Sequence, residues 1–289
     1  MKLRYNKYRF AFAFGSLAII VLFTLAPLVY SLQLSLQSGR ANNLEFSGLD
    51  NYRRLFDDAI ITKALTNTIG FSVILTPMVL IISFLLANCI NKVRSQKLKG
   101  FYSVILFFPS ITSPVAYAFF FKRLFAADGF LNNFTLLFNP QAESINYLLT
   151  PIGARIAIVI ICIWAWSGYY TMLLLSAMQS VDPLVYKAAR IDGLNNRQIL
   201  RKITLPIIKP VVLFCSVLLS GGIFQLFAEI MIISKGGPEH STITLAYYIY
   251  QLCFVYVPQF GYAASIAILI FLISGTIGFI QLRLGEKSI

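Results

Sequence analysis

The chain has 289 residues, of which 58% are hydrophobic and only 12% are charged, and its formal net charge is +13. A soluble domain has about a quarter charged residues, so this composition excludes an ordinary soluble enzyme and a disordered chain. The pI of about 9.7 fits nucleic-acid binding only if the positive charge gathers on a water-exposed face. The positions of the charges therefore decide the class of protein.

Six long stretches lack charged residues, apart from Glu229 in the fifth. A hydrocarbon core about 30 Å thick requires about 20 residues of helix, so each stretch is long enough to cross a membrane. In chain order, the predicted spanning helices are 10–36, 66–91, 101–122, 154–178, 208–233 and 260–282.

Two stretches allow a second interpretation. The first apolar run is longer than the roughly 7–15 apolar residues of a signal peptide, so we expect an anchor that is retained. Residues 241–257 are uncharged and rich in Tyr and Thr. Because tyrosine favours the headgroup level, we interpret them as an interfacial segment, with a seventh span as the alternative.

The charged residues also predict the orientation. Six spans place both termini on one side, and the segments on that side contain 16 basic residues against 3 acidic ones, whereas the opposite side has 8 basic and 7 acidic. The positive-inside rule makes the first side cytoplasmic. We therefore expect a cytoplasmic N-terminus (1–9), one six-helix transmembrane domain (10–283) and a cytoplasmic tail (284–289). The basic pI reports topology, not nucleic-acid binding.

Sequence signatures of catalysis are missing from the chain. It has no nucleotide-binding glycine-rich loop, no nucleophile triad and no paired carboxylates. The four cysteines lack metal-ligand spacing and are interpreted as packing residues, and the single histidine, His240, as an exposed loop residue. We expect no catalytic residue, metal or bound cofactor here, so any ATP must be hydrolysed by another chain.

The cytoplasmic loop 179–207 has its own helix signals. Asp182 suits an N-cap, Pro183 the first helical position and Gly193 a left-handed C-terminal cap. About ten residues of helix lie between these signals, and Leu184, Ala188 and Ile191 share one face.

A second helical turn, 196–202, is expected to end at Thr204-Leu205-Pro206. A basic helix lying at the headgroups is the alternative for this loop. Its caps and small residues favour a docking element instead.

The motif of this loop resembles that of a known family. The resemblance is carried by Tyr186-Lys187-Ala188-Ala189-Arg190-Ile191-Asp192-Gly193 and Ile203-Thr204-Leu205-Pro206. These residues resemble the EAA loop of ABC importer permeases, in the form found in the carbohydrate-uptake group of maltose and glycerol-3-phosphate importers. Segments 48–56, 64–68 and 236–245 resemble the same family in the same order.

The resemblance implies an all-α, multi-pass protein of the prokaryotic cell membrane with the type I ABC importer permease fold. It implies a second permease subunit of different sequence, two cytoplasmic ATPases that hold ATP and Mg, and an extracellular or periplasmic binding protein. The implied function is ATP-driven import of a sugar or oligosaccharide by alternating access. The alternatives are a non-sugar solute such as glycerol-3-phosphate and an ion-coupled secondary transporter.

Matching positions of the motif define the expected ATPase-coupling residues: Tyr186, Lys187, Ala188, Ala189, Asp192, Gly193, Leu205 and Pro206. One position departs, because Lys187 stands where the family has the glutamate of its motif. We expect this loop to dock mainly by shape, through Tyr186, Ala188, Ala189 and Gly193.

Aromatic and polar residues within the spans are the expected substrate contacts, since sugars are bound by ring stacking and hydrogen bonds. The candidates are Trp164, Trp166, Tyr169, Tyr170, Gln225 and Glu229. Gln225 and Glu229 would share one helix face, and an acid within a span is a functional candidate. The alternatives are packing for the aromatics and contact with interfacial water for Glu229. The outer segments 124–151 and 236–258 are expected to meet the binding protein.

Overall fold

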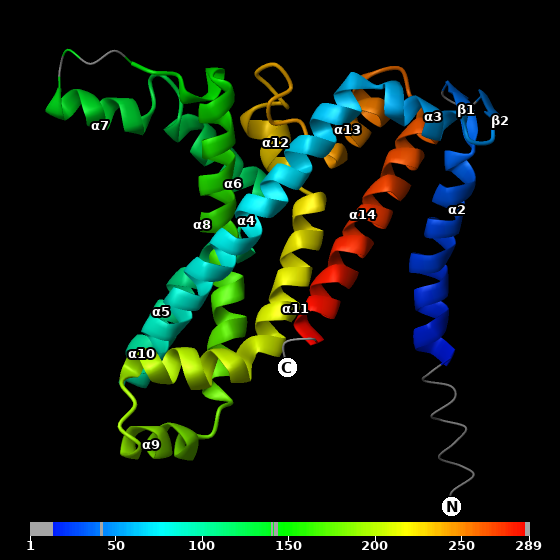
Figure 1. Ribbon diagram of the computed structural model, residues 1–289. Coiled ribbons are helices and arrows are strands. Elements are labelled where there is room, and N and C mark those ends of the chain that lie inside the picture. The colour runs from blue at the N-terminus through cyan, green and yellow to red at the C-terminus, as the bar shows by residue number, and fades with distance from the viewer. Residues whose placement is uncertain (1–13, 41–42, 140, 142–143, 287–289) are drawn as a thin grey trace, which may run out of the picture. The chain divides into compact units, whose positions relative to one another are not determined.

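The computed structural model describes the whole chain except residues 1–13, 41–42, 140, 142–143 and 287–289. The described residues are helical apart from one β-hairpin (Figure 1). They contain five helices long and apolar enough to cross a membrane, or six if a bent pair is counted as one span. The predicted N-terminal segment 1–9, the start of the first span and the end of the tail lie outside the described residues.

The chain divides into two compact units, of which the first holds Met1–Ile61 and Tyr248–Leu272. Its apolar helix Phe14–Ser35 includes α2 (Ala26–Ser35) and leads into the antiparallel strands β1 (Gln37–Arg40) and β2 (Asn43–Phe46). The remaining elements are α3 (Asp50–Asp57), the start of α4 (Ala59–Asn91), the end of α13 (Leu245–Tyr250), a π-helical turn (Gln251–Val255) and the start of α14 (Phe260–Glu286). The hairpin was not expected in an all-α chain.

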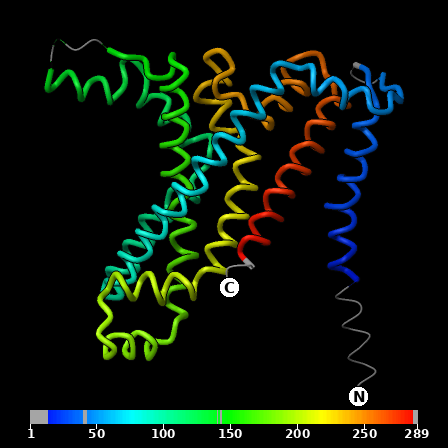
Figure 2. Tube along the Cα trace, in the orientation of Figure 1, coloured from blue at the N-terminus to red at the C-terminus, as the bar shows by residue number. Residues whose placement is uncertain are grey.

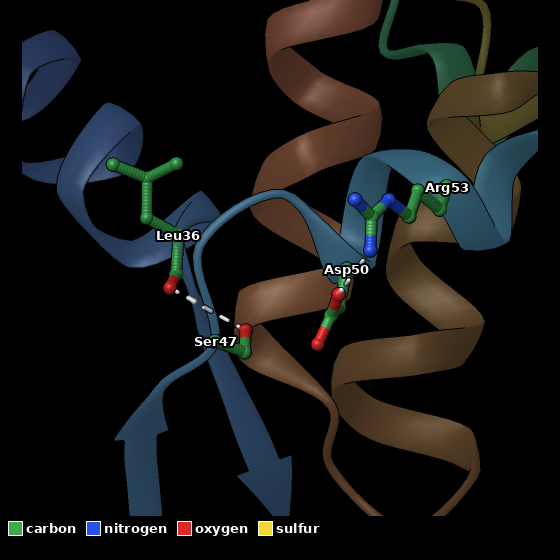
Figure 3. A network of polar contacts seen from close by, with 4 residues as sticks. All are labelled: Leu36, Ser47, Asp50 and Arg53. Carbon is green, nitrogen blue, oxygen red and sulfur yellow. Dashed lines mark hydrogen bonds and ion pairs between the residues drawn. The ribbon is translucent and has the colours of Figure 1, made fainter.

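Polar contacts close the junction between α2, the hairpin and α3. Ser47 donates to the carbonyl oxygen of Leu36 from its backbone N–H at 2.9 Å and from its hydroxyl at 3.4 Å (Figure 3). The buried Asn51 amide donates to the carbonyls of Ser35 and Gln37. The nearby Arg53–Asp50 ion pair is largely exposed, so it contributes little to stability.

Asp58 organises the start of α4. Its carboxylate accepts hydrogen bonds from the backbone N–H of Ile60 and from the hydroxyls of Tyr248 and Tyr262. The guanidinium of Arg54 lies 3.9 Å from the centroid of the Tyr262 ring. Burial alone would raise the pKa of Asp58, but the hydrogen bonds that its charged form accepts outweigh burial and lower that pKa below 3.8.

The second unit holds Thr62–Tyr247 and Ile273–Ile289, and so includes most of α4 and the end of α14. Its other helices in chain order are α5 (Gln96–Ile111), α6 (Pro114–Leu124), α7 (Phe130–Phe138), α8 (Pro151–Gln179), α9 (Pro183–Ile191), α10 (Asn196–Ile199), α11 (Leu205–Phe224), α12 (Ala228–Ile233) and the start of α13 (Leu245–Tyr250). Short turns at Tyr147–Leu149 and Leu200–Thr204 join neighbouring helices.

The prediction of one continuous helix over residues 101–122 is wrong. The chain forms α5 and α6, which are bent by 93° at the break between them. The proline ring of Pro114 disfavours a helical conformation in the preceding residue, and Ser113 has the extended angles φ −55° and ψ 129°. Pro114 then occupies the favourable first position of α6, so the break is encoded locally.

The helix predicted at 208–233 is also broken. Helix runs from Asn196 through a π-helical turn to Phe224, so the second turn of the loop does not end at Thr204–Pro206 but continues into α11. The helix then stops before α12 (Figure 2). Thr244 donates to the carbonyl of Leu226 at 2.7 Å and satisfies a backbone group that the break leaves without a helical partner.

The predicted interfacial segment 241–257 is partly interior. Tyr247 and Tyr248, which were expected to mark the headgroup level, are buried in the protein, as are Ser241, Thr242 and Thr244. Helix is present over Leu245–Val255. At 1.5 Å per residue this is about 16 Å long, roughly half the hydrocarbon thickness.

Candidate functional site

A cavity of about 460 Å³ lies among α5, α6, α8, α11 and α12, all in the second unit. Its lining includes five of the six predicted pathway residues: Trp166, Tyr169, Tyr170, Gln225 and Glu229. The structure therefore brings together side chains from α8 and from both sides of the α11–α12 break.

Close packing of α5 on α8 forms one wall of this cavity. A Cβ atom at Gly168 would collide with the carbonyl oxygen of Leu106, so glycine permits the two backbones to approach. The Ser110 hydroxyl donates to the carbonyl of Ala165 at 2.8 Å and accepts from the backbone N–H of Tyr169 at 3.1 Å. Ser110 therefore fixes α5 opposite the aromatic residues of α8.

Glu229 lies on the cavity wall and is only 5% exposed. The Tyr117 hydroxyl donates a hydrogen bond to its carboxyl group. The low exposure of Glu229 and its hydrogen bond with Tyr117 of α6 favour a role at the cavity over simple contact with interfacial water. Gln225 and Glu229 were predicted to share one face of a single helix. This prediction is wrong, because Gln225 caps α11 and Glu229 belongs to α12. Both side chains still line the cavity, one on each side of the break between the two helices.

Trp164 is the predicted pathway residue that the cavity lining does not include. It is 40% exposed, and its ring contacts the edges of Tyr117 and Phe121 at centroid distances of 5.9 and 5.2 Å. The packing interpretation therefore fits Trp164. Sequence reasoning missed Tyr117 and Ser110 on the lining, although a tyrosine late in an apolar run was an available signal.

A second polar cluster ties α4 and α8 to the segment before α13. Arg155 donates from Nε to the carbonyl of Ser241 at 2.8 Å and from Nη2 to the side-chain oxygen of Asn67 at 3.2 Å. The Asn67 amide donates to the carbonyls of His240 and Ile243. The cluster joins three distant parts of the chain, namely Asn67, Arg155 and residues 240–243, so the sequence pattern did not reveal it.

The predicted helix in the coupling loop is α9, and its caps have the predicted chemistry. Asp182 accepts from the backbone N–H of Leu184 at 2.8 Å. Gly193 has a φ of +78°, and the backbone N–H of Leu194 donates to the carbonyl of Ala189 at 3.0 Å. This left-handed glycine closes the C-terminus as expected.

The faces of α9 differ from the docking expectation. Ala189 is 4% exposed and Tyr186 is half-buried, with its hydroxyl 3.4 Å from the Thr204 hydroxyl that donates to it. These two residues attach α9 to the rest of the unit, so they are not on its free surface. The predicted apolar face, Leu184, Ala188 and Ile191, is exposed, and so are Pro183, Val185, Lys187 and Arg190.

Within the described residues, no group of three or more His, Cys, Asp and Glu side chains is arranged to hold a metal ion. Cys162 and Cys215 are buried, as packing residues should be, whereas Cys89 is exposed. The interpretation of all four cysteines as packing residues is therefore wrong for Cys89.

Apolar spans, a cavity at helix breaks within the membrane-crossing region and a separate capped helix in a basic loop define a polytopic helical subunit of a membrane transporter. The chain belongs to the family described as "Binding-protein-dependent transport system inner membrane component", which it matches over residues 79–289. It is thus a multi-pass protein of the bacterial inner membrane and the permease component of an ABC transporter, not its ATPase.

Two similar proteins are transport permeases. The lactose transport system permease protein LacF of Rhizobium radiobacter is 36% identical over 283 residues, covering 97% of this chain and 95% of LacF. The multiple sugar-binding transport system permease protein MsmF of Streptococcus mutans is 29% identical, covering 86% of this chain and 84% of MsmF.

The fold matches a solved structure. This is the crystal structure of a bacterial alginate ABC transporter in complex with an alginate pentasaccharide-bound periplasmic protein. The TM-score is 0.85 and the identity 21%, with 99% of this chain and 96% of that chain covered. The expected type of permease fold is confirmed by this match.

Proposed function

We propose that this chain forms half of the membrane pathway of an ATP-driven importer for an uncharged sugar or oligosaccharide. The observation that carries the proposal is the chemistry of the 460 Å³ cavity. Aromatic rings of Trp166, Tyr169 and Tyr170 offer faces for stacking on a sugar ring, while Gln225 and Glu229 offer hydrogen-bonding groups. The sugar names of the relatives LacF and MsmF support the same substrate class.

The lining also favours a neutral substrate over glycerol-3-phosphate. Among the described residues that line the cavity there is no Lys, Arg or His, and Glu229 is an acid. A phosphate or carboxylate in this space would lack the cationic partners that such groups normally have when bound. An ion-coupled transporter would be expected to carry several ionisable groups along its pathway, whereas Glu229 is the one acid of this lining.

The partners follow from the family and from the loop. A second permease subunit of different sequence would complete the pathway, a periplasmic binding protein would deliver the sugar, and two ATPases would hold ATP and Mg on the cytoplasmic side. In this arrangement the present chain binds no cofactor. The excess of basic over acidic residues in the N-terminal segment, the 92–99 loop and the 179–207 loop supports a cytoplasmic position for these three segments.

The coupling loop would transmit ATP-driven closure through α9. Its exposed face, Leu184, Ala188 and Ile191, supports docking in an apolar cleft of the ATPase, with Asp192 and Gly193 shaping its end. Lys187 on the same exposed helix brings a positive charge. Leu205 and Pro206 begin α11, so motion of the loop would pass directly into that span.

The proposal is tested on the purified complex by measuring ATPase activity with the binding protein and a panel of neutral and acidic oligosaccharides. We expect stimulation by at least one neutral sugar. The matched variants Trp166→Ala and Trp164→Ala separate the cavity from its surroundings, because only Trp166 lines it. Stimulation should fall mainly in Trp166→Ala. No stimulation by any sugar, or stimulation confined to acidic ones, would overturn the proposal.

A further inference from the structure

The exposed side chains of α7 are unusually apolar for a loop helix. Its nine residues carry no charge. Phe130, Phe134, Leu137 and Phe138 are 66%, 49%, 77% and 78% exposed. The rings of Phe130 and Phe134 and those of Phe134 and Phe138 contact each other at centroid distances of 6.1 and 5.1 Å. We call these four residues the aromatic face of α7.

The opposite side of α7 is held in place. Asn132 is 2% exposed, and its amide donates to the carbonyls of Ala126 and Ile145 at 3.0 and 2.8 Å. Its side-chain oxygen accepts from the backbone N–H of Ile145 at 2.9 Å. Both connections of the helix are thus tied to one buried side chain. The rotation of α7 is fixed, and the exposure of its aromatic face is a property of the fold.

The position of α7 matches the surface of a bilayer. The helix lies to one side of the Pro151 end of α8 and runs crosswise to α8, at the end opposite the one that leads to α9 (Figure 1). The 29 residues of α8 extend about 43 Å, which exceeds the roughly 30 Å of hydrocarbon, so the ends of α8 reach the headgroups. A helix lying across such an end has its axis along the membrane surface.

The apolar surface also continues from α7 onto α6. A hollow of about 330 Å³ is lined by Phe120, Leu124 and Phe130, with Arg123 and Asp128 among its other lining residues. Phe120 is 64% exposed. Arg123 and Asp128 form an exposed ion pair at 2.8 Å, as expected for groups at the polar headgroup layer. The aromatic face therefore joins the exposed apolar side of a membrane-crossing segment.

We propose that α7 is an interfacial helix whose aromatic face lies in the outer leaflet of the membrane, at the boundary between headgroups and acyl chains. Aromatic residues favour this boundary, and an apolar helix face lying in the plane of the interface buries itself there. A docking site for a soluble binding protein would be ringed by polar groups, whereas the aromatic face continues past Phe130 onto the exposed apolar ring of Phe120 on α6. Lipid, not the binding protein, is therefore the partner of this part of segment 124–151.

Fluorescence quenching by brominated lipid tests the proposal in the assembled complex. Phe134→Trp places a reporter on the aromatic face, and Asn133→Trp places one on the neighbouring exposed position outside it. Each variant is reconstituted in phosphatidylcholine vesicles brominated near the upper acyl chain, and the signal of the parent protein, which contains Trp164 and Trp166, is subtracted. We expect quenching of the added emission to be at least about twofold stronger for Phe134→Trp, because its side chain would be immersed in lipid.

Equal, weak quenching of both reporters would overturn the proposal. Blue-shifted but unquenched emission from Phe134→Trp would place a second permease subunit against α7, and red-shifted emission that turns blue on adding the binding protein would assign the face to that protein. Retained ATPase activity shows that each variant assembles. If the first pair fails this control, Phe138→Trp and Thr135→Trp provide the same comparison on the same helix.

Discussion

The loop helix α9, for which we propose a coupling role, and the cavity around Glu229 are built in contrasting ways. Local signals define α9, since Asp182 caps its start and Gly193 its end, and much of its surface is exposed. The cavity depends on residues far apart in the chain, such as the hydrogen bond from Tyr117 to Glu229 across 112 positions. A helix that must meet a separate protein can be defined locally, whereas a buried polar site needs tertiary partners to offset the cost of burial.

The largest effect is expected at the cavity. Glu229→Leu removes the acceptor of the Tyr117 hydroxyl and leaves a buried donor unsatisfied, which costs about 1–3 kcal/mol. The same change removes a hydrogen-bonding group from the proposed sugar pathway; since about 1.4 kcal/mol of lost binding corresponds to a factor of ten, we expect sugar uptake in vesicles to fall about tenfold. Glu229→Gln keeps an acceptor and should retain more uptake. Equal loss in both variants would show that the carboxyl group acts through something other than this hydrogen bond.

Arg155 tests whether a second tertiary cluster matters as much as the cavity. Arg155→Met keeps much of the side-chain length but removes the hydrogen bonds to Ser241 and Asn67. Arg155 is itself exposed, so we expect its two hydrogen bonds to contribute together about 1 kcal/mol and the melting temperature of the complex to drop by about 2–4 °C. The exposed Arg123→Met, which removes only a surface ion pair, serves as control. Similar melting temperatures for both variants would contradict the role of the cluster.

Substitution of Gly193 tests whether this capping residue defines the end of α9. Its φ of +78° disfavours any residue with a Cβ by about 1–2 kcal/mol, although the space around that Cβ is open. Gly193→Val should therefore distort the end of α9 and lower the ratio of sugar transported to ATP hydrolysed. Gly100→Val, at an exposed helical position, should leave that ratio nearly unchanged. An unaltered ratio in Gly193→Val would count against coupling through this loop.

Asp58 is held both by a neighbouring backbone group and by two tyrosines far away in the chain. We expect substitution of Asp58 to have the smallest effect. Because the pKa of Asp58 is lowered in the folded protein, its contribution to stability is present above the unfolded pKa of about 3.9 and is lost as the pH falls through the lower folded value. Partial exposure limits the gain to below about 1 kcal/mol. In the parent, the hydrogen-exchange protection factors of the Ile60 and Ile61 amides, taken relative to the intrinsic rate at each pH, should fall below pH ~4.

The matched variants for this site are Asp58→Asn and Asp57→Asn, the latter at an exposed neighbouring position. Asp58→Asn should exchange faster already at neutral pH and lose the acid dependence. Asp57→Asn should behave like the parent. Retained acid dependence in Asp58→Asn would assign it to another group.

The sequence by itself determined the class of protein and the ends of α9, because uncharged stretches, charge asymmetry and capping residues act over short distances. It also contained the break before Pro114, which we did not predict. Only the tertiary structure decided the break between α11 and α12, where a hydroxyl from Thr244 satisfies the freed carbonyl of Leu226. It likewise decided that Trp166 lines the cavity while Trp164 does not, since two tryptophans two residues apart differ only in what packs against them.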